Sequence, residues 1–425
     1  MHENVQNKEL AVLVGLDTGK EDIDASLSEL EELTKTADAE VIGMITQKLG
    51  TPSSSTYVGS GKLEEITEFC ENNDVDLLIF DDELSPTQIR NIEQATDIRT
   101  IDRSMLILDI FASRAKSSEG KLQVELAQMK YLMPRLTGKG IELSRQGGSG
   151  QSGIATRGPG ETKLETDRRH IRRRIQSLRE HLKNVEKQRI GLRQRRIKEG
   201  IPTVALVGYT NSGKSTLMNA LTDAGVLAEN KLFATLDPTA RALLLPNGQK
   251  VLLIDTVGFI RKLPHHLIEA FKSTLEEAVF SSVILNICDI HDPEAPIHLK
   301  VTKDLLTELG CTDQPVITVF NKCDLLENNH QENDIEYDSD SVGISALHAT
   351  GLDDLLNAIE KALPPTRKKL KFLFPFSMSG MVSKIRKNGT VLQEEYVDNG
   401  ILIEAVIDVN FLSSVIHEVD SFIVN

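Results

Sequence analysis

The sequence has no tryptophan, and aromatic residues make up only 4% of its 425 residues. Proteins that hold single-stranded nucleic acid by base stacking depend on aromatic side chains, so the composition disfavours that class. Cysteine is scarce too. The four cysteines form no CxxC pair, which argues against a disulfide framework and against a zinc site. We therefore expect free thiols in a reducing compartment.

Long apolar runs are also missing. No stretch approaches the roughly 18 consecutive apolar residues that a membrane-spanning helix needs. Residues 1–8 are polar and acidic, whereas a secretory signal begins with basic residues and continues with an apolar run. These features predict a cytoplasmic protein with no integral membrane segment. At roughly 100 to 200 residues per domain, the length predicts two to four domains.

The formal net charge of −15 disfavours a nucleic-acid partner, but the charge is unevenly distributed. Between Arg157 and Gly200, 15 Lys and Arg stand against 6 Asp and Glu, a net charge of +9, so the remainder carries −24. A solvated helix whose charges serve only solubility is the plainer interpretation. The succession Arg172, Arg173, Arg174 favours phosphate binding instead, because arginine pairs well with phosphate oxygens.

Residues 1–103 predict a small parallel α/β domain. Short apolar runs alternate with segments whose apolar residues recur every three or four positions, as amphipathic helices require. Parallel neighbouring strands need a connection long enough to hold a helix, which this alternation supplies. The predicted strands are 10–16, 41–46, 76–80 and 98–101, and the predicted helices are 23–35, 62–72 and 86–95.

Residues 104–200 predict a long helical hairpin. One helical pattern covers 104–136 and a second covers 161–198, with the glycine-rich segment 138–160 between them. We expect an antiparallel pair that projects from the body, with a glycine-rich tip loop and a basic second helix. A passive linker is the alternative for the loop, although its glycines are interspersed with Lys139, Arg145 and Arg157.

Residues 201–364 predict a second α/β domain that binds a nucleotide. The apolar run 203–207 is followed at once by Gly208–Ser215, which matches GxxxxGK(S/T), and then by a helical pattern. In that motif backbone N–H groups face phosphate oxygens, lysine neutralises the β- and γ-phosphates, and the hydroxyl binds Mg²⁺. The predicted phosphate-binding residues are Gly208, Tyr209, Thr210, Asn211, Ser212, Gly213, Lys214, Ser215, Thr216, Asp255 and Gly258.

A similar run, Gly59-Ser-Gly61-Lys62, is not a nucleotide site by this pattern. The motif would require glycine in place of Thr56 and a hydroxyl in place of Leu63. We interpret the run as a turn before a helix that contacts a partner or has no ligand.

Two further motifs favour GTP over ATP. Asp255-Thr-Val-Gly258 follows the strand-like run 251–254 and places a carboxylate where it can orient a Mg²⁺-bound water. Asn321-Lys-Cys-Asp324 follows the run 316–320, and a carboxylate there accepts two hydrogen bonds from guanine that adenine cannot donate. The predicted guanine-binding residues are Asn321, Lys322, Asp324, Ser345, Ala346 and Leu347.

This arrangement resembles the translation-factor class of small GTPases, in which the ligand lies at the carboxyl edge of a doubly wound sheet. The resemblance implies that residues 232–239 form the first switch and that Thr235 binds Mg²⁺, with Thr239 as the alternative. The implied magnesium ligands are Ser215, Thr235 and, through water, Asp255. The implied switch residues are Phe233, Thr235, Thr239 and Phe259.

Three longer segments resemble the HflX family of ribosome-associated GTPases: 153–169, 57–62 and 233–239. The resemblance implies a hairpin loop that reaches toward the peptidyl-transferase centre of the large ribosomal subunit, and a GTP-bound form that splits stalled or idle ribosomes. It also implies a cytoplasmic, ribosome-associated location. The implied contacts to ribosomal RNA are Arg145, Arg157, Arg168, Arg169, Arg172, Arg173 and Arg174.

Charge alone indicates only a polyanion. A GTP-dependent binding module for another structured RNA or for the membrane surface therefore remains the alternative. An ATP-driven helicase would share the P-loop, but it would not need the guanine-specific motif Asn321-Lys-Cys-Asp324.

The last segment, 365–425, predicts a small α+β domain with strands at 372–376, 393–397 and 401–407 and a turn at 398–400.

Hydrolysis is predicted to be slow in the isolated protein. Phe259 stands where many GTPases carry a glutamine that orients the attacking water. Groups from the ribosome, or K⁺ held near the phosphates by Asn211, are the candidate replacements, the latter by resemblance to potassium-activated relatives. Arg241 could act as an arginine finger within the chain, but an exposed structural charge is the favoured interpretation.

Overall fold

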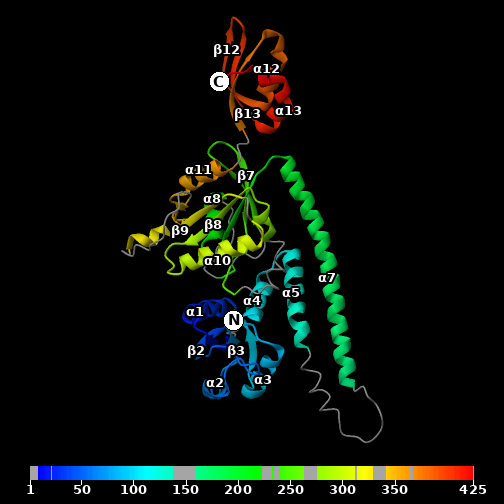
Figure 1. The fold of residues 1–425 in the computed structure, drawn as a ribbon, viewed down its shortest axis with the longest axis vertical. Coiled ribbons are helices and arrows are strands. Elements are labelled where there is room, and N and C mark those ends of the chain that lie inside the picture. The colour runs from blue at the N-terminus through cyan, green and yellow to red at the C-terminus, as the bar shows by residue number, and fades with distance from the viewer. Residues whose placement is uncertain are drawn as a thin grey trace, which may run out of the picture.

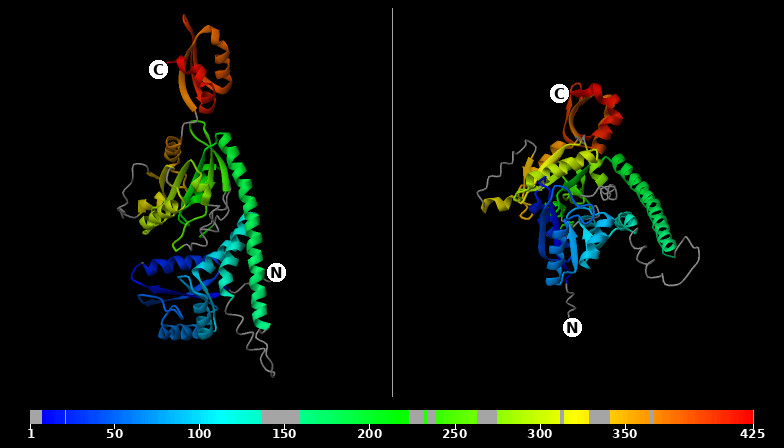
Figure 2. Two further views of the ribbon diagram at one scale, coloured as in Figure 1. Left: turned by 45° about the vertical axis from the view of Figure 1, so that its right-hand side comes forward. Right: turned by 60° about the horizontal axis from the view of Figure 1, so that its bottom comes forward.

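The computed structural model describes residues 8–20, 22–136, 159–222, 232–233, 239–262, 275–311, 314–328, 341–363 and 367–424. Their strands form three sheets, one in each of three bodies that follow one another along the long axis (Figure 1). The N-terminal body lies at one end, the C-terminal body at the other, and the long helix α7 (Pro159–Lys198) runs along one side. Two further views show the same order (Figure 2). The predicted multidomain α/β class is confirmed.

The N-terminal sheet is fully parallel, with strand order β2-β1-β3-β4. Each predicted strand and helix of this domain is present within a few residues. Aspartate and serine cap two of the helices: Asp22 accepts from two backbone N–H groups of α1, and Ser85 forms a capping box with Gln88 on α3. The elements are β1 (Leu10–Asp17), α1 (Ile23–Thr36), β2 (Glu40–Lys48), α2 (Ser60–Asn72), β3 (Leu77–Phe80), α3 (Pro86–Thr96) and β4 (Arg99–Asp102).

The single helix expected over 104–136 is wrong, because the segment forms two helices, α4 (Arg103–Arg114) and α5 (Ser118–Arg135). The chain is extended at Ala115, and the Ser117 hydroxyl accepts a hydrogen bond from the Gly120 N–H at 2.8 Å, which starts a new helix. Helix α4 buries Leu106, Ile107 and Phe111 in the core it shares with the N-terminal sheet. It therefore belongs to the N-terminal domain, and the hairpin begins at α5.

The hairpin consists of α5 and the 40-residue helix α7, which at 1.5 Å per residue is on the order of 60 Å long. Apolar side chains on both helices recur at alternating spacings of four and three, as in a coiled coil. They form one seam, made of Leu122, Leu126, Met129 and Met133 on α5 and Ile171, Ile175, Leu178 and Leu182 on α7. The predicted antiparallel pair is thus present. Most of the glycine-rich tip, with Arg145 and Arg157, lies outside the described residues.

The central sheet has six strands in the order β10-β9-β8-β5-β7-β6, parallel except for β6. Alternate residues of β5 face opposite cores: Ala205 and Val207 join the core that includes Leu306 of α10, while Val204 and Leu206 join the core of α8 and α11. Helices thus cover both faces, as predicted for a doubly wound sheet. The elements are β5 (Thr203–Gly208), α8 (Lys214–Thr222), β6 (Thr239–Leu244), β7 (Lys250–Asp255), β8 (Val283–Asp289), α10 (Ala295–Glu308), β9 (Val316–Asn321), β10 (Ser341–Gly343) and α11 (Leu352–Ala362).

The C-terminal body is an antiparallel sheet, order β12-β13-β11-β14, covered by two helices. The predicted turn at 398–400 connects β12 to β13. Gly400 has φ +151°, and a Cβ there would lie 2.1 Å from the Phe374 carbonyl oxygen, so the close approach requires glycine. The elements are β11 (Arg367–Phe374), α12 (Ser379–Asn388), β12 (Gly389–Val397), β13 (Gly400–Asp408), α13 (Val409–Val419) and β14 (Ile423–Val424).

Candidate nucleotide site

The loop between β5 and α8 has the shape that its motif predicts. Gly208, Asn211 and Gly213 adopt positive φ values of +147°, +61° and +96°. A Cβ on Gly208 would lie 2.2 Å from the Ile287 carbonyl oxygen, and one on Gly213 would lie 2.1 Å from Asn321 Nδ2. Both positions therefore require glycine, and the tight loop opens directly onto the N-terminus of α8, where an anion is favoured.

Lys214 points back into this loop. Its ammonium donates to the carbonyl oxygens of Gly208, at 3.0 Å, and Tyr209, at 2.6 Å. Burial lowers the pKa of Lys214 to about 8, and the nearby Asp255 carboxylate opposes that shift. A Cβ on Gly258 would lie 3.0 Å from Nζ, so the Asp255–Gly258 motif passes directly beside the ammonium. A phosphate at this loop would lie between the two motifs.

The predicted magnesium ligands Ser215 and Asp255 lie together. The Ser215 hydroxyl donates to Asp255 Oδ2 at 2.8 Å, and Asp255 is fully buried at the end of β7. Oxygen donors of this kind fit Mg²⁺. Thr239, the alternative to Thr235, begins β6 and pairs with Asp255 in the sheet. Thr235 lies outside the described residues.

A cavity of about 370 Å³ joins the phosphate loop to the predicted guanine motifs. Its walls come from the carboxyl ends of β5, β9 and β10, which meet at one edge of the same sheet although β5 precedes β9 by more than 100 residues in sequence. The lining residues are Asn211, Gly213, Thr216, Asn321, Lys322, Asp324, Leu325, Ser345, Ala346 and Leu347.

Asn321 ties two walls of this cavity together. Its side-chain Nδ2 donates to the Ser212 carbonyl oxygen at 2.9 Å, and its Oδ1 accepts from the Ala346 N–H at 3.0 Å. Lys322 is held in turn by an ion pair with Asp289, at 2.6 Å. Asn321 and Lys322 thus hold the loops in place, which leaves Asp324 as the candidate for base recognition.

Asp324 is available for that role. Its carboxylate lines the cavity and is partly exposed, and His348 Nε2 lies 3.7 Å from its Oδ2. Two acceptor oxygens at one edge of the cavity would suit the paired donors of guanine and leave adenine unmatched.

Two residues predicted at the phosphates or the switch face elsewhere with their side chains. The Tyr209 ring is buried, its hydroxyl donates to the Glu29 carboxylate of α1, and it accepts from the Arg261 N–H at 2.6 Å. Burial raises the pKa of Tyr209 above its usual range. Phe259 is 1% exposed, and its backbone pairs with Gly208 and Thr210. Phe259 therefore packs beneath the loop and has no group to orient a water.

The contact between the N-terminal and central domains was not predicted from the sequence. Lys262 lies four residues after Gly258 in the sequence. It pairs with Asp81 at 2.6 Å and with Asp82 at 2.8 Å. Phe233 of the predicted switch packs edge-on against Phe111 of α4, with ring centroids 4.6 Å apart. The only sequence signal for these partners was the position of Asp81 and Asp82 just after a predicted strand.

Two groups of arginines on α7 differ in their partners. The inner arginines, Arg189, Arg193 and Arg196, pair with glutamates: Arg189 with Glu119, and the other two with the buried Glu277 at 3.2 and 3.4 Å. The Arg193 guanidinium also lies 3.7 Å above the Phe280 ring.

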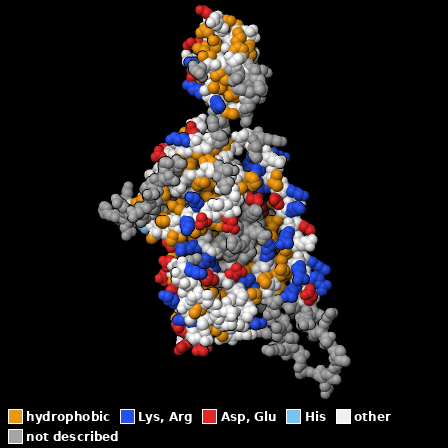
Figure 3. Space-filling model, viewed as in Figure 1, with side chains coloured by type: hydrophobic (Ala, Val, Ile, Leu, Met, Phe, Trp, Pro, Cys, Tyr) orange, Lys and Arg blue, Asp and Glu red, His pale blue; other side chains and the backbone are white. Residues whose placement is uncertain are grey.

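The outer arginines, Arg169, Arg172 and Arg173, are exposed. Among the described side chains, only Glu165 pairs with any of them, with Arg172 at 3.7 Å. Arg168 is half-buried, and Arg174 differs from its neighbours because both Glu125 oxygens accept from its guanidinium, at 2.6 and 2.7 Å. Lys and Arg side chains gather along the side of the molecule that α7 occupies (Figure 3).

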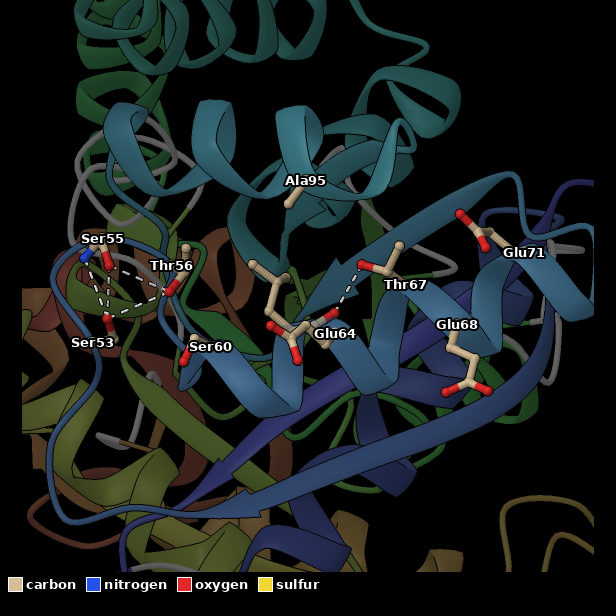
Figure 4. A pocket seen from close by; sticks show the side chains of 10 residues that line it. Ser53, Ser55, Thr56, Ser60, Glu64, Thr67, Glu68, Glu71 and Ala95 are labelled. Atoms are coloured by element: carbon tan, nitrogen blue, oxygen red, sulfur yellow. Dashed lines mark hydrogen bonds between the residues drawn. The ribbon is translucent and has the colours of Figure 1, made fainter.

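The run Gly59-Ser-Gly61-Lys62 begins helix α2, as interpreted from the sequence. Lys62 pairs with Glu65 at 2.7 Å. A cavity of about 700 Å³ lies beside it, lined by hydroxyls of the 53–60 loop and by Glu64, Glu68 and Glu71 of α2 (Figure 4). Three carboxylates make this a poor site for phosphate.

None of the described helices is both long and apolar enough to cross a membrane.

Three family models match successive parts of the chain. Residues 24–112 match a model described as GTP-binding GTPase N-terminal, and residues 114–196 match GTP-binding GTPase middle region. Residues 203–322, which hold the phosphate loop and Asn321, match 50S ribosome-binding GTPase.

Known relatives cover almost the whole chain. GTPase HflX of Caldanaerobacter subterraneus subsp. tengcongensis is 51% identical over 405 residues, which are 95% of this chain and 92% of that protein. GTPase HflX of Lacrimispora saccharolytica is 49% identical over 426 residues, 99% of this chain and 100% of that protein. GTPase HflX of Escherichia coli is 43% identical over 85% of each chain. With a nucleotide cavity built from the predicted motifs and relatives of this similarity, the chain belongs to the HflX family of GTPases.

Proposed function

We propose that the protein binds the large ribosomal subunit in its GTP form and separates stalled or idle ribosomes. One observation carries the proposal: the outer half of α7 presents the exposed arginines Arg169, Arg172 and Arg173, while its inner half pairs with Glu277 of the nucleotide-binding domain. The match of residues 203–322 to a 50S ribosome-binding GTPase model supports the choice of partner. Such a protein acts in the cytoplasm, associated with ribosomes.

Within the nucleotide site, each motif has one task. Lys214 would exchange its two carbonyl contacts for phosphate oxygens, and Asp324 would accept from guanine. Ser215 and Asp255, with Thr235 or Thr239, would hold Mg²⁺, which supplies positive charge to the β- and γ-phosphates when bound.

Hydrolysis by the isolated protein is slow in this proposal, because Phe259 is buried and cannot orient water. The missing group comes from the ribosome or from K⁺ beside Asn211, which lines the cavity. Arg241 is exposed on β6, which fits a structural charge better than an arginine finger.

Binding would depend mainly on phosphate contacts. Each arginine that neutralises a phosphate of ribosomal RNA releases counterions, so affinity falls as salt rises. Residues 147–153, in the tip loop, are proposed to act in the separation step, whereas the helix supplies affinity.

The test is sedimentation with purified large subunits in the presence of a non-hydrolysable GTP analogue, GDP or no nucleotide, combined with light scattering of intact ribosomes. We expect co-sedimentation with the GTP analogue and loss of scattering when GTP is added. Deleting residues 147–153 should leave much of the binding and abolish the loss of scattering. If the deletion variant splits ribosomes as fully as the wild type does, the tip loop is only a linker.

The alternative is a GTP-dependent module for another structured RNA or for a membrane surface. The outer arginines would serve either ligand. Equal binding to anionic phospholipid vesicles and to large subunits, or tighter binding to an unrelated folded RNA, would favour this alternative and contradict the proposed partner.

A further inference from the structure

Outside the nucleotide cavity, three side chains with metal-binding atoms meet at the start of α10. Asp292, Glu294 and His298 each place one such atom within 4.8 Å of the other two. His298 Nδ1 lies 3.6 Å from Asp292 Oδ2, and Nε2 lies 4.0 Å from Glu294 Oε2. These distances are too long for hydrogen bonds. The two distances join different ring nitrogens, and an ion can bind only one of them, so a site here would use one nitrogen of His298 with one oxygen each from Asp292 and Glu294, atoms that lie within 4.8 Å of one another.

Each carboxylate is held in place by its other oxygen. Asp292 Oδ1 accepts from the Glu294 N–H at 2.9 Å, and Glu294 Oε1 accepts from the Arg261 guanidinium. Asp292 Oδ2 and Glu294 Oε2 therefore remain turned toward the imidazole. Supporting hydrogen bonds of this kind orient the ligands in protein metal sites.

His298 is the least exposed of the three residues, at 8%. Its ring stacks on Tyr209, with centroids 3.7 Å apart and an interplanar angle of 13°, which fixes the orientation of both ring nitrogens. Within the described part of the chain, neither nitrogen is within hydrogen-bonding distance of a partner. An imidazole that is oriented by stacking in this way can bind an ion through one ring nitrogen.

The donor set indicates which ion. Two carboxylates, one guanidinium and a neutral imidazole leave the cluster with one negative charge. One nitrogen with two oxygens suits Zn²⁺ and similar transition metals, whereas Mg²⁺ and Ca²⁺ prefer oxygen alone. Both carboxylates are partly exposed, so a water can complete a four-coordinate site.

We propose that Asp292, Glu294 and His298 bind a divalent transition-metal ion of the Zn²⁺ class. The absence of a CxxC pair argued against a zinc site, but that argument bears only on thiolate ligands, and this site uses none of the four cysteines. It is separate from the magnesium ligands Ser215 and Asp255. The ion would lie beside Arg261, three residues after Gly258, and beside the ring of Tyr209.

The test is a titration of the chelator-treated full-length protein with Co²⁺, which has visible absorption bands that report coordination. GDP and excess Mg²⁺ are kept present so that the nucleotide site is occupied. We expect one equivalent of Co²⁺ to bind with the bands of a four-coordinate nitrogen and oxygen site. One equivalent of Zn²⁺ should then displace it.

Two variants and one control locate the ion. Asp292→Asn preserves the size of the side chain and its bond from the Glu294 N–H, so the loop should fold, and we expect at least about tenfold weaker binding. His298→Ala should weaken binding further. His291→Ala, an exposed histidine on the same loop, should bind as the wild type does.

The proposal is overturned by absent Co²⁺ bands, or by Asp292→Asn binding with unchanged affinity. Sulfur-to-cobalt charge-transfer bands that disappear after alkylation of the cysteines would overturn it as well.

Discussion

The nucleotide cavity and the outer half of α7 both present positive charge suited to phosphate, but they hold it in opposite ways. Lys214 is buried, and two carbonyl oxygens fix its ammonium. The outer arginines Arg169, Arg172 and Arg173 are exposed side chains on a helix surface. A fixed charge can distinguish one ligand from another by geometry. An exposed charge contributes an attraction that depends on the salt concentration and little on the nucleotide sequence of the RNA.

The largest effect in the nucleotide cavity is expected for Asp324→Asn. The variant replaces a charged acceptor of two guanine hydrogen bonds, so we expect GTP affinity to fall about 1,000-fold. Affinity for xanthosine triphosphate should rise, because the amide can donate where xanthine has a carbonyl. Competition titrations with the four nucleoside triphosphates measure both changes, and equal competition by ATP in the wild type would contradict the assignment of this motif.

Lys214→Met should weaken GTP binding about 100-fold through loss of the charged contact to the phosphates. In the wild type, affinity should also fall above pH 8, because burial lowers the pKa of Lys214 to about 8 and the neutral amine must gain a proton to hold the phosphates. We expect about tenfold weaker binding at pH 9 than at pH 7. If the Lys214→Met variant shows the same pH dependence, another group is responsible.

The inner and outer arginines allow paired charges to be compared with exposed charges on one helix, α7. Arg193→Met removes a guanidinium that pairs with the buried Glu277 and covers Phe280, so we expect the free energy of unfolding to fall by about 1–3 kcal/mol. Arg173→Met, on the same helix, should change stability by less than about 0.5 kcal/mol. Urea denaturation of the two variants measures this, and equal stability would mean that the inner pairs contribute nothing to the folded state.

The smallest expected effect concerns the monovalent cation. Replacing Na⁺ by K⁺ should raise the GTP turnover a few-fold if Asn211 holds the ion, and Asn211→Ala should remove that difference. A multiple-turnover phosphate-release assay without ribosomes measures it. The same increase in both proteins would assign the cation effect to a different part of the chain.

The convergence of the predicted nucleotide motifs follows from the sequence because each motif is local. Gly208, Gly213 and Lys214 follow one strand, and the carboxyl ends of parallel strands meet at one edge of the sheet, so separate motifs were certain to converge. The orientation of Tyr209 could not be predicted. It depends on Glu29 and Arg261, which lie 180 and 52 residues away in the chain.

Helix boundaries and charge partners account for the other differences. Residues 116–121 (Lys-Ser-Ser-Glu-Gly-Lys) contain no apolar residue, and this gap together with the Ser117 cap is the sequence signal that α4 ends and α5 begins here. Arg174 and Arg173 are adjacent in sequence, yet Glu125 of α5 faces only the former. A count of arginines therefore overestimates the number that are available to RNA.

The most direct measurement is the salt dependence of large-subunit binding in the presence of a GTP analogue. It compares the wild type with Arg169→Gln/Arg172→Gln/Arg173→Gln and with Arg193→Gln/Arg196→Gln. We expect the slope of log affinity against log salt to fall by roughly one for each outer arginine removed. The inner variant should keep the wild-type slope. Equal slopes for the wild type and the outer variant would contradict the claim that the outer half of α7 is the RNA-binding surface.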